Sequence, residues 1–109
     1  MANTYKVLGQ SIPAAATSTA IYTVPGATSA IISSIVVANQ SAVATSFRIS
    51  VAVAGAALET KQYLYFDVPI FGNDTFTLTL GIGLATTDVI RVYATLATLS
   101  FNIFGVEIT

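Results

Sequence analysis

The stretch TFTLTL at residues 75–80 decides the fold class of this chain. Its apolar side chains, Phe76, Leu78 and Leu80, alternate with threonines, and every second side chain of an extended strand points to the same face. The stretch TSFRISVAVA at residues 45–54 alternates in the same way. Its larger apolar side chains are Phe47, Ile49, Val51 and Val53. Both patterns predict β-strands that pack one face on a core and leave the other face outside.

Other segments carry the same strand signals, and turn residues such as Pro25-Gly26 and Gly72-Asn73-Asp74 lie between them. These segments are residues 17–24 (TSTAIYTV), 30–38 (AIISSIVVA), 62–70 (QYLYFDVPI), 89–95 (VIRVYAT) and 99–108 (LSFNIFGVEI). No segment has the length that a stable amphipathic helix needs. We therefore expect an all-β protein, an antiparallel β-sandwich of seven to eight strands with jelly-roll or immunoglobulin-like topology.

Residues 30–38 are apolar on both faces of the expected strand. Ile31, Ile35 and Val37 are expected on one face, and Ile32 and Val36 on the other. Such a strand either lies in the centre of the fold or presents its second face to another subunit.

Residues 62–70 alternate less cleanly. The pattern predicts Leu64, Phe66 and Val68 on one side and Tyr63, Tyr65 and Asp67 on the other. Pro69 cannot donate a ladder hydrogen bond, so we expect this strand to end there or to lie at a sheet edge. Glycines lead to two further predictions. Residues 81–83 (GIG) predict a bend or sheet corner, and Gly105 predicts a bulge or a close backbone approach.

The first sixteen residues differ from the rest, because residues 13–16 (PAAA) have the composition of an extended connector. We divide the chain into residues 1–16, an extended N-terminal arm or an edge strand, and residues 17–109, the β-sandwich domain. In the first alternative the arm reaches beyond the compact domain. In the second, residues 3–10 form a first edge strand followed by a loop.

Composition limits the chemistry that this chain can perform. The sequence has no His, Cys or Trp, four Lys or Arg and five Asp or Glu, with a net charge of −1. Proton transfer, nucleophilic catalysis and metal binding all draw on groups that are scarce here. Asp67 and Asp74 lie near aromatic residues, but a turn aspartate such as Asp74 commonly bonds its own backbone. We expect no enzymatic activity, and no catalytic, cofactor-binding or metal-binding residues.

The same composition also bears on which classes of partner the chain can bind. There is no basic run that would attract nucleic acid, and polar residues interrupt the most apolar stretch, residues 27–44. We therefore expect neither nucleic acid nor a membrane as a partner. The strands at residues 30–38 and 75–80 carry no charge, whereas monomeric sheet proteins guard open edges with Lys, Pro or inward charges. This favours a homo-oligomer.

The candidate interface residues are the outward-facing apolar, aromatic and arginine side chains of these strands. They are Tyr5, Val7, Ile31, Ile35, Val37, Arg48, Tyr63, Tyr65 and Arg91. Each arginine has three alternatives: a solvated side chain, an ion pair with Asp67, or a bond to a carbonyl of a neighbouring subunit. Tyr63, Tyr65 and Phe66 would form a sugar-stacking platform if two of them shared an exposed face.

Long stretches of the chain resemble small structural proteins of tailed bacteriophages. The resemblance is carried by residues 47–70 (FRISVAVAGAALETKQYLYFDVPI), 73–95 (NDTFTLTLGIGLATTDVIRVYAT) and 99–108 (LSFNIFGVEI), with TYKVLGQ at 4–10 and YTVP at 22–25. It covers nearly the whole chain, but its motifs are ordinary sandwich strands.

The resemblance implies a virion protein, above all a capsid decoration or cement protein. Copies of such a protein, often as trimers, would lie on the outer capsid surface and hold the major capsid protein or another virion protein in place. The N-terminal arm would reach a neighbouring subunit. The alternative that it implies is a tail, collar or baseplate component, or a fibre-associated module that binds a receptor or glycan. The resemblance transfers no functional site to particular residues.

Overall fold

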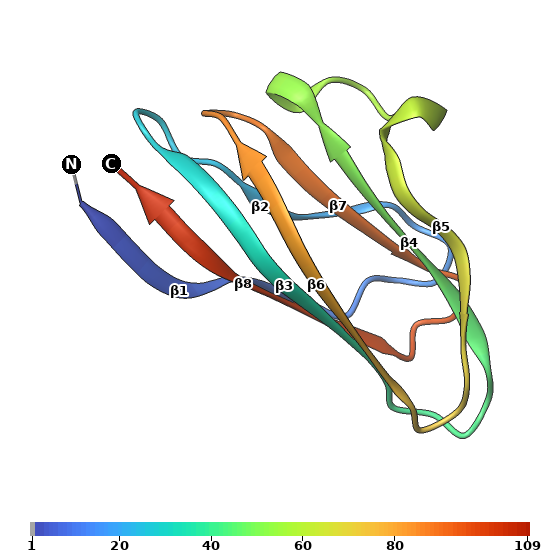
Figure 1. Ribbon diagram of the computed structural model, residues 1–109. Helices are drawn as coiled ribbons and strands as arrows, with labels where there is room; N and C mark the ends of the chain where they lie inside the picture. The colour runs from blue at the N-terminus through green and yellow to red at the C-terminus, as the bar shows by residue number, and fades with distance from the viewer. Residues whose placement is uncertain (1) are drawn as a thin grey trace.

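Eight strands and two short 3-10 turns make up the computed structural model, which describes residues 2–109 (Figure 1). The strands are β1 (Asn3–Ser11), β2 (Thr19–Thr23), β3 (Ser29–Asn39), β4 (Thr45–Ala52), β5 (Tyr63–Ile70), β6 (Thr75–Leu84), β7 (Val89–Ala94) and β8 (Leu99–Ile108). The turns η1 (Val53–Gly55) and η2 (Thr60–Gln62) lie in the connection between β4 and β5. The described chain contains no helix with the length and apolarity needed to cross a membrane.

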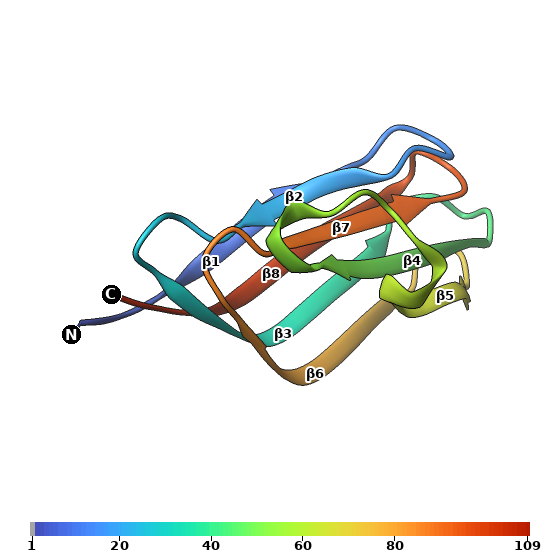
Figure 2. The same cartoon turned by 90° about the horizontal axis from the view of Figure 1, so that it is seen from above.

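The strands form two antiparallel four-stranded sheets, with orders β1-β8-β3-β6 and β2-β7-β4-β5. The first strand pairs with the last, the second with the seventh, the third with the sixth and the fourth with the fifth. This nested pairing is a long hairpin rolled into a sandwich, which is the jelly-roll arrangement. The expected β-sandwich is confirmed, and of the two expected topologies the chain has the jelly roll (Figures 1 and 2).

Aromatic side chains join the two sheets in the middle of the core. Phe47 of β4 lies edge-to-face against Phe76 of β6 and Phe101 of β8, with ring centroids 5.7 and 6.1 Å apart. The alternation at residues 75–80 holds as predicted, since Leu78 is buried and the three threonines are exposed. In β4, Phe47 and Ile49 are buried as predicted.

Strand β4 ends two residues earlier than expected. Val53 lies in η1 and is exposed, and the next residue, Ala54, has a φ of 54°. Because the chain leaves the strand for the 3-10 turn at Val53, the alternation ends at Ala52, and the prediction that Val53 shares the face of Phe47 and Ile49 is wrong.

A β-bulge at Ser33 changes the faces of β3. The register with β8 shifts between Ile32 and Ser34, and Ser33 Oγ donates to the carbonyl of Phe104 at 3.1 Å. One extra residue reverses the side on which every later side chain lies. Ile32 therefore shares the core face with Ile35 and Val37, and Ile31 faces outward, which corrects the predicted grouping of Ile31 with the other two.

A second bulge changes the faces of β5. Phe66 and Asp67 together lie opposite Arg48, and Asp67 has a φ of 52°. As a result Tyr65 and Val68 pack against the core, while Leu64 and Phe66 are exposed. The predicted grouping of Leu64, Phe66 and Val68 on one side of the strand is therefore wrong, because Val68 faces the core and the other two do not. The expectation that the strand containing Pro69 lies at an edge is confirmed, because β5 is an outer strand of its sheet.

The N-terminal segment forms an edge strand and a connector. Strand β1 pairs antiparallel with β8, and the connector then crosses to the other sheet, where Ala16 N donates to the Ala94 carbonyl at 2.8 Å. Of the two alternatives for residues 1–16, residues 2–16 thus follow the edge strand, and Met1 lies outside the described residues.

Strand β6 continues through Gly81 and Gly83 to Leu84, with a shift of register between Thr79 and Ile82 where a bend was expected.

Candidate interaction surfaces

Arg48 is the centre of a cluster on the outer face of the sheet β2-β7-β4-β5. Its guanidinium carbon lies 4.2 Å from the ring centroid of Phe66 and 4.3 Å from that of Tyr93. Tyr63 lies edge-to-face against Phe66, with ring centroids 4.9 Å apart. We call Arg48, Tyr63, Phe66, Asp67 and Tyr93 the Arg48 cluster. The cluster exposes aromatic surface around the guanidinium of Arg48, whose charge is paired with the carboxylate of Asp67.

The partner of Arg48 is the carboxylate of Asp67. Arg48 Nε donates to Asp67 Oδ1 at 2.7 Å, and Nη2 donates to Oδ2 at 3.3 Å. The bulge at Asp67 turns this carboxylate toward β4, and the hydrogen bonds it accepts raise the pKa of Arg48. Of the three alternatives for Arg48, the structure has the ion pair within the chain. Arg91 does not share it, because its Nη1 donates to the carbonyl of Ala56 at 3.0 Å.

The remaining aspartates hold loops. Asp74 Oδ1 accepts from the backbone of Thr75 at 2.8 Å, as expected for a turn aspartate. Asp88 accepts from the backbone of Ala54 and of Ala85, both at 2.9 Å, and so fastens two loops to each other. Among residues 2–109, no three His, Cys, Asp or Glu residues gather in a way that would hold a metal ion.

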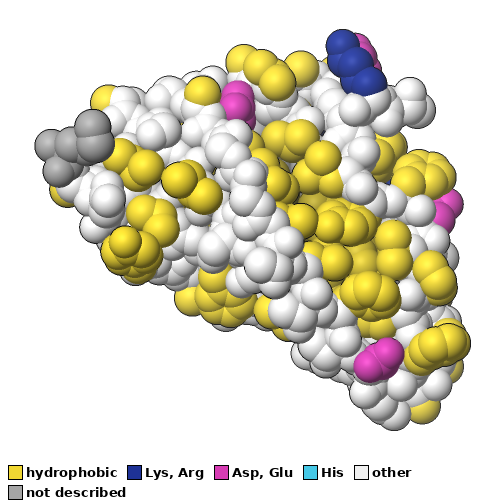
Figure 3. Space-filling model, viewed as in Figure 1, with side chains coloured by type: hydrophobic (Ala, Val, Ile, Leu, Met, Phe, Trp, Pro, Cys, Tyr) yellow, Lys and Arg dark blue, Asp and Glu magenta, His cyan; other side chains and the backbone are white. Residues whose placement is uncertain are grey.

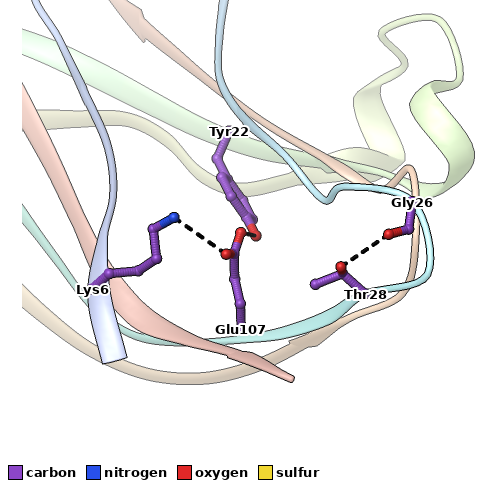
Figure 4. Close-up of polar contacts among 5 residues, drawn as sticks. All are labelled: Lys6, Tyr22, Gly26, Thr28 and Glu107. Carbon is purple, nitrogen blue, oxygen red and sulfur yellow. Dashed lines mark hydrogen bonds and ion pairs between the residues drawn. The ribbon is translucent and has the colours of Figure 1, made fainter. Parts of the chain in front are cut away.

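Glu107 joins the two sheets at the end that holds both termini (Figures 1 and 4). Tyr22 Oη of β2 donates to Glu107 Oε2 at 2.7 Å, and Lys6 Nζ of β1 donates to Oε1 at 3.3 Å. Nearby, Thr28 Oγ1 donates to the carbonyl of Gly26 at 3.0 Å and tightens the turn after β2. We call Lys6, Tyr22 and Glu107 the Glu107 clamp.

Charge and burial in the Glu107 clamp shift two pKa values. Burial, and then the hydrogen bond to Glu107, raise the pKa of Tyr22. The hydrogen bond from Tyr22, and then the contact with Lys6, lower the pKa of Glu107. Both shifts favour a neutral tyrosine that donates to a charged carboxylate. The clamp is therefore a structural tie between the sheets.

The variant Tyr22→Phe tests this tie. Removing the hydroxyl is expected to lower the free energy of unfolding by about 1 kcal/mol near neutral pH. The lowered pKa of Glu107 gives stability that is present above about pH 4.5 and is lost as the pH falls. The raised pKa of Tyr22 gives stability that is present below about pH 10 and is lost as the pH rises. The difference between wild type and variant should thus be largest between these limits.

Urea unfolding at a series of pH values measures this difference. Tyr5→Phe is the matched control, because Tyr5 is 78% exposed, and it is expected to change stability little at any pH. A Tyr22→Phe effect that stays constant from pH 3 to pH 7 would contradict the charged hydrogen bond.

A row of apolar side chains crosses the outer face of the other sheet. Tyr5 of β1 and Ile31 of β3 both lie opposite Val106 of β8, and Val7 lies opposite Phe104. Tyr5, Val7 and Ile31 are exposed, and the two β8 residues are half-buried. We call these five residues the Tyr5 patch. Three of the predicted interface residues therefore lie side by side.

The other predicted interface residues divide into different places. Ile35 and Val37 are 0% exposed and belong to the core, which corrects their prediction as interface residues. The physical reason is the bulge at Ser33, which turns them inward. Arg48 and Tyr63 lie in the Arg48 cluster. Tyr65 packs against the core, so it does not share a face with Tyr63 and Phe66, and the sugar-stacking platform loses that member.

Hydrophobic side chains also fill a hollow between β6 and the strands β4 and β5 (Figure 3). The inward-facing residues there are only partly buried; they are Val51, Tyr65, Val68, Phe76, Leu80 and Ile82. Near η2 this side of the molecule contains a pocket of about 320 Å³ whose lining includes Val51 and Leu64. The edge strands β1 and β2 on the opposite side are in contact.

Sequence reasoning did not find several exposed apolar residues, above all Phe71, which is 75% exposed. Phe71 lies in the turn before β6, outside any periodic stretch, so no alternation indicated its position. Together with the Tyr5 patch and the Arg48 cluster, it gives the described chain a surface rich in apolar contact area.

The comparisons with known proteins add no relative, because no protein-family model, curated protein or solved structure matches this chain.

Proposed function

We propose that this chain is a non-enzymatic structural protein of a bacteriophage virion, and that it acts as a capsid decoration or cement protein. The observation that carries the proposal is the Tyr5 patch, an exposed apolar row on a sheet with almost no charge. Exposed apolar surface of this kind is typical of a protein–protein contact. The jelly roll recurs in viral capsid proteins, but also in lectins and cupins, so the fold supports the proposal only by analogy.

The proposed partner is the major capsid protein or another virion protein, and the proposed location is the outer surface of the capsid. A lattice contact needs many modest interactions repeated over the shell, and neutral sheet surfaces supply them without charge repulsion. The chain would act as a homo-oligomer, with the trimer as the stoichiometry that the resemblance implies. Reinforcement of the lattice would come from bridging adjacent capsid subunits.

Binding to particles that lack this protein tests the proposal. The wild-type chain is expected to bind at a fixed number of copies per particle and to raise the temperature at which particles release their DNA. The double variant Tyr5→Asp/Ile31→Asp should lose at least about 90% of this binding, because it places charge in the patch. Val43→Asp is the matched control in an exposed loop and should bind normally. Normal binding by the double variant would contradict the patch as the contact.

A second candidate function is a tail, collar, baseplate or fibre-associated module that binds a receptor glycan. The observation that favours it is the Arg48 cluster, in which Phe66 is 55% exposed beside Tyr63. Aromatic rings with an exposed face are suited to stack on sugar rings. A glycan array is expected to give binding that Phe66→Ala abolishes and Phe71→Ala preserves. An array without any binding by wild type would remove this candidate.

A further inference from the structure

We propose that two copies of this chain pair through strand β6. A sandwich of two open sheets has four edge strands, here β1, β2, β5 and β6. An edge strand has a row of backbone N–H and C=O groups with no partner in its own sheet, and such a row accepts another extended strand. The inference depends on which of the four edges is left unprotected.

Three edges have features that hinder strand addition. Strand β1 carries Lys6 and a break in register between Val7 and Gly9. Strand β2 is only five residues long and also has a break in register. Strand β5 contains Pro69 and two breaks in register, one of which is the bulge at Asp67. Charge, proline, short length and bulges are the features by which sheet proteins protect their edges.

Strand β6 has much weaker protection. It is ten residues long and contains neither a charged residue nor a proline. From Thr75 to Thr79 it pairs in unbroken register with residues 34–38 of β3, so this part of the edge is regular. Its one register shift comes later, between Thr79 and Ile82. Figures 1 and 2 show no described segment beside its free side.

A second copy of the same strand fits this edge. Two β6 strands related by a two-fold axis run antiparallel, which is the arrangement of every strand pair in this sandwich. The strand is neutral, so its copies meet without charge repulsion. On the outer side the threonines of both copies form cross-strand pairs. On the inner side, the added strand places a second set of Phe76, Leu80 and Ile82 next to the apolar hollow and covers part of it.

Such a contact has consequences for the assembly. A two-fold contact joins copies in even numbers: it gives a dimer when it acts alone and a hexamer when it joins two trimers. The inference rests on the oligomeric part of the proposed function and names the contact, but it does not require a capsid.

Two oppositely charged double variants test the pairing. Thr77→Lys/Thr79→Lys and Thr77→Glu/Thr79→Glu change exposed threonines that do not contribute to the core. Each variant alone is expected to pair at least about 100-fold more weakly than wild type, because like charges then face each other. An equimolar mixture of the two should restore pairing. Analytical ultracentrifugation across concentrations measures the mass, and Ala20→Lys/Thr23→Lys on edge strand β2 is the control that should behave as wild type.

Hydrogen exchange gives an independent measurement. In wild type, backbone amides between Thr75 and Thr79 that point away from β3 are expected to be protected at high concentration and to exchange rapidly on dilution. A wild-type chain that stays monomeric at high concentration would overturn the inference. So would an oligomer whose mass is unchanged by charges on β6.

The particle-binding assay separates this inference from the proposed function. A monomeric chain that still binds particles overturns the pairing and the oligomeric part of the proposed function, but leaves the capsid-binding role in place. A chain that pairs through β6 but has no affinity for particles supports the pairing and overturns the proposed function.

Discussion

Replacing Phe47 with alanine is expected to lower the free energy of unfolding by about 3–5 kcal/mol. Phe47 is fully buried, and its ring is the contact between β4 of one sheet and both β6 and β8 of the other. Alanine removes the apolar area, two edge-to-face contacts and the volume that keeps the sheets at their spacing. The loss is a large part of the stability of a domain of this size, which is about 5–15 kcal/mol.

Urea unfolding followed by tyrosine fluorescence or circular dichroism measures the effect. Phe71→Ala is the matched control, because it removes the same side chain from an exposed turn and should change stability by less than about 0.5 kcal/mol. If Phe47→Ala does not fold, Phe47→Leu keeps the prediction testable, with an expected loss of about 1–2 kcal/mol. Equal effects at Phe47 and Phe71 would contradict the assignment of the core.

Regular alternation made part of this core predictable from sequence. Phe47, Ile49 and Leu78 were expected to face inward because apolar residues recur at every second position around them, and all three are buried. The errors fall where one residue interrupts this period. At Ser33 and at Asp67 a single inserted residue exchanges the two faces of the strand, and neither residue type distinguishes a bulge from regular strand.

The topology is set by which strands pair across long distances in the sequence, and local alternation carries no information about those pairs. Strand β1 pairs with β8 at the far end of the chain, and this pairing is what separates the jelly roll from an immunoglobulin-like sandwich. The expected segments are compatible with both. The choice is made by which strands meet, and short-range propensity does not encode that.

The candidate surfaces, like the fold, were predicted from sequence only in part. An ion pair between Arg48 and Asp67 was one of the alternatives, and the structure contains it. Phe66 was considered for a sugar-stacking platform, but its position beside the guanidinium of Arg48 was not predicted. The bond between Tyr22 and Glu107 joins residues 85 positions apart, and nothing in either segment indicated it.

Replacing Gly105 with alanine is expected to lower the free energy of unfolding by about 3 kcal/mol. Gly105 lies in the central strand β8, opposite Lys6 of β1 and Ile32 of β3. A Cβ atom there would overlap the carbonyl oxygen of Ile31 and come within 2.9 Å of Leu8 Cδ1. A backbone carbonyl in a central strand cannot move aside without breaking ladder hydrogen bonds, so β1 and β3 would both shift. The close backbone approach expected at this glycine is thereby confirmed.

Gly83→Ala is the control that separates crowding from the general effect of replacing glycine in a strand. No atom lies within 4 Å of a Cβ at Gly83, which is in the edge strand β6. Alanine there restricts the unfolded chain without a clash and should raise stability by about 0.5 kcal/mol. Urea unfolding of both variants at one low protein concentration compares them directly. If both replacements changed stability by the same amount, the tight contact of β8 with its neighbours would not be what requires glycine at position 105. The opposite signs expected here would instead locate that requirement in the space between β1, β8 and β3, beneath the Tyr5 patch.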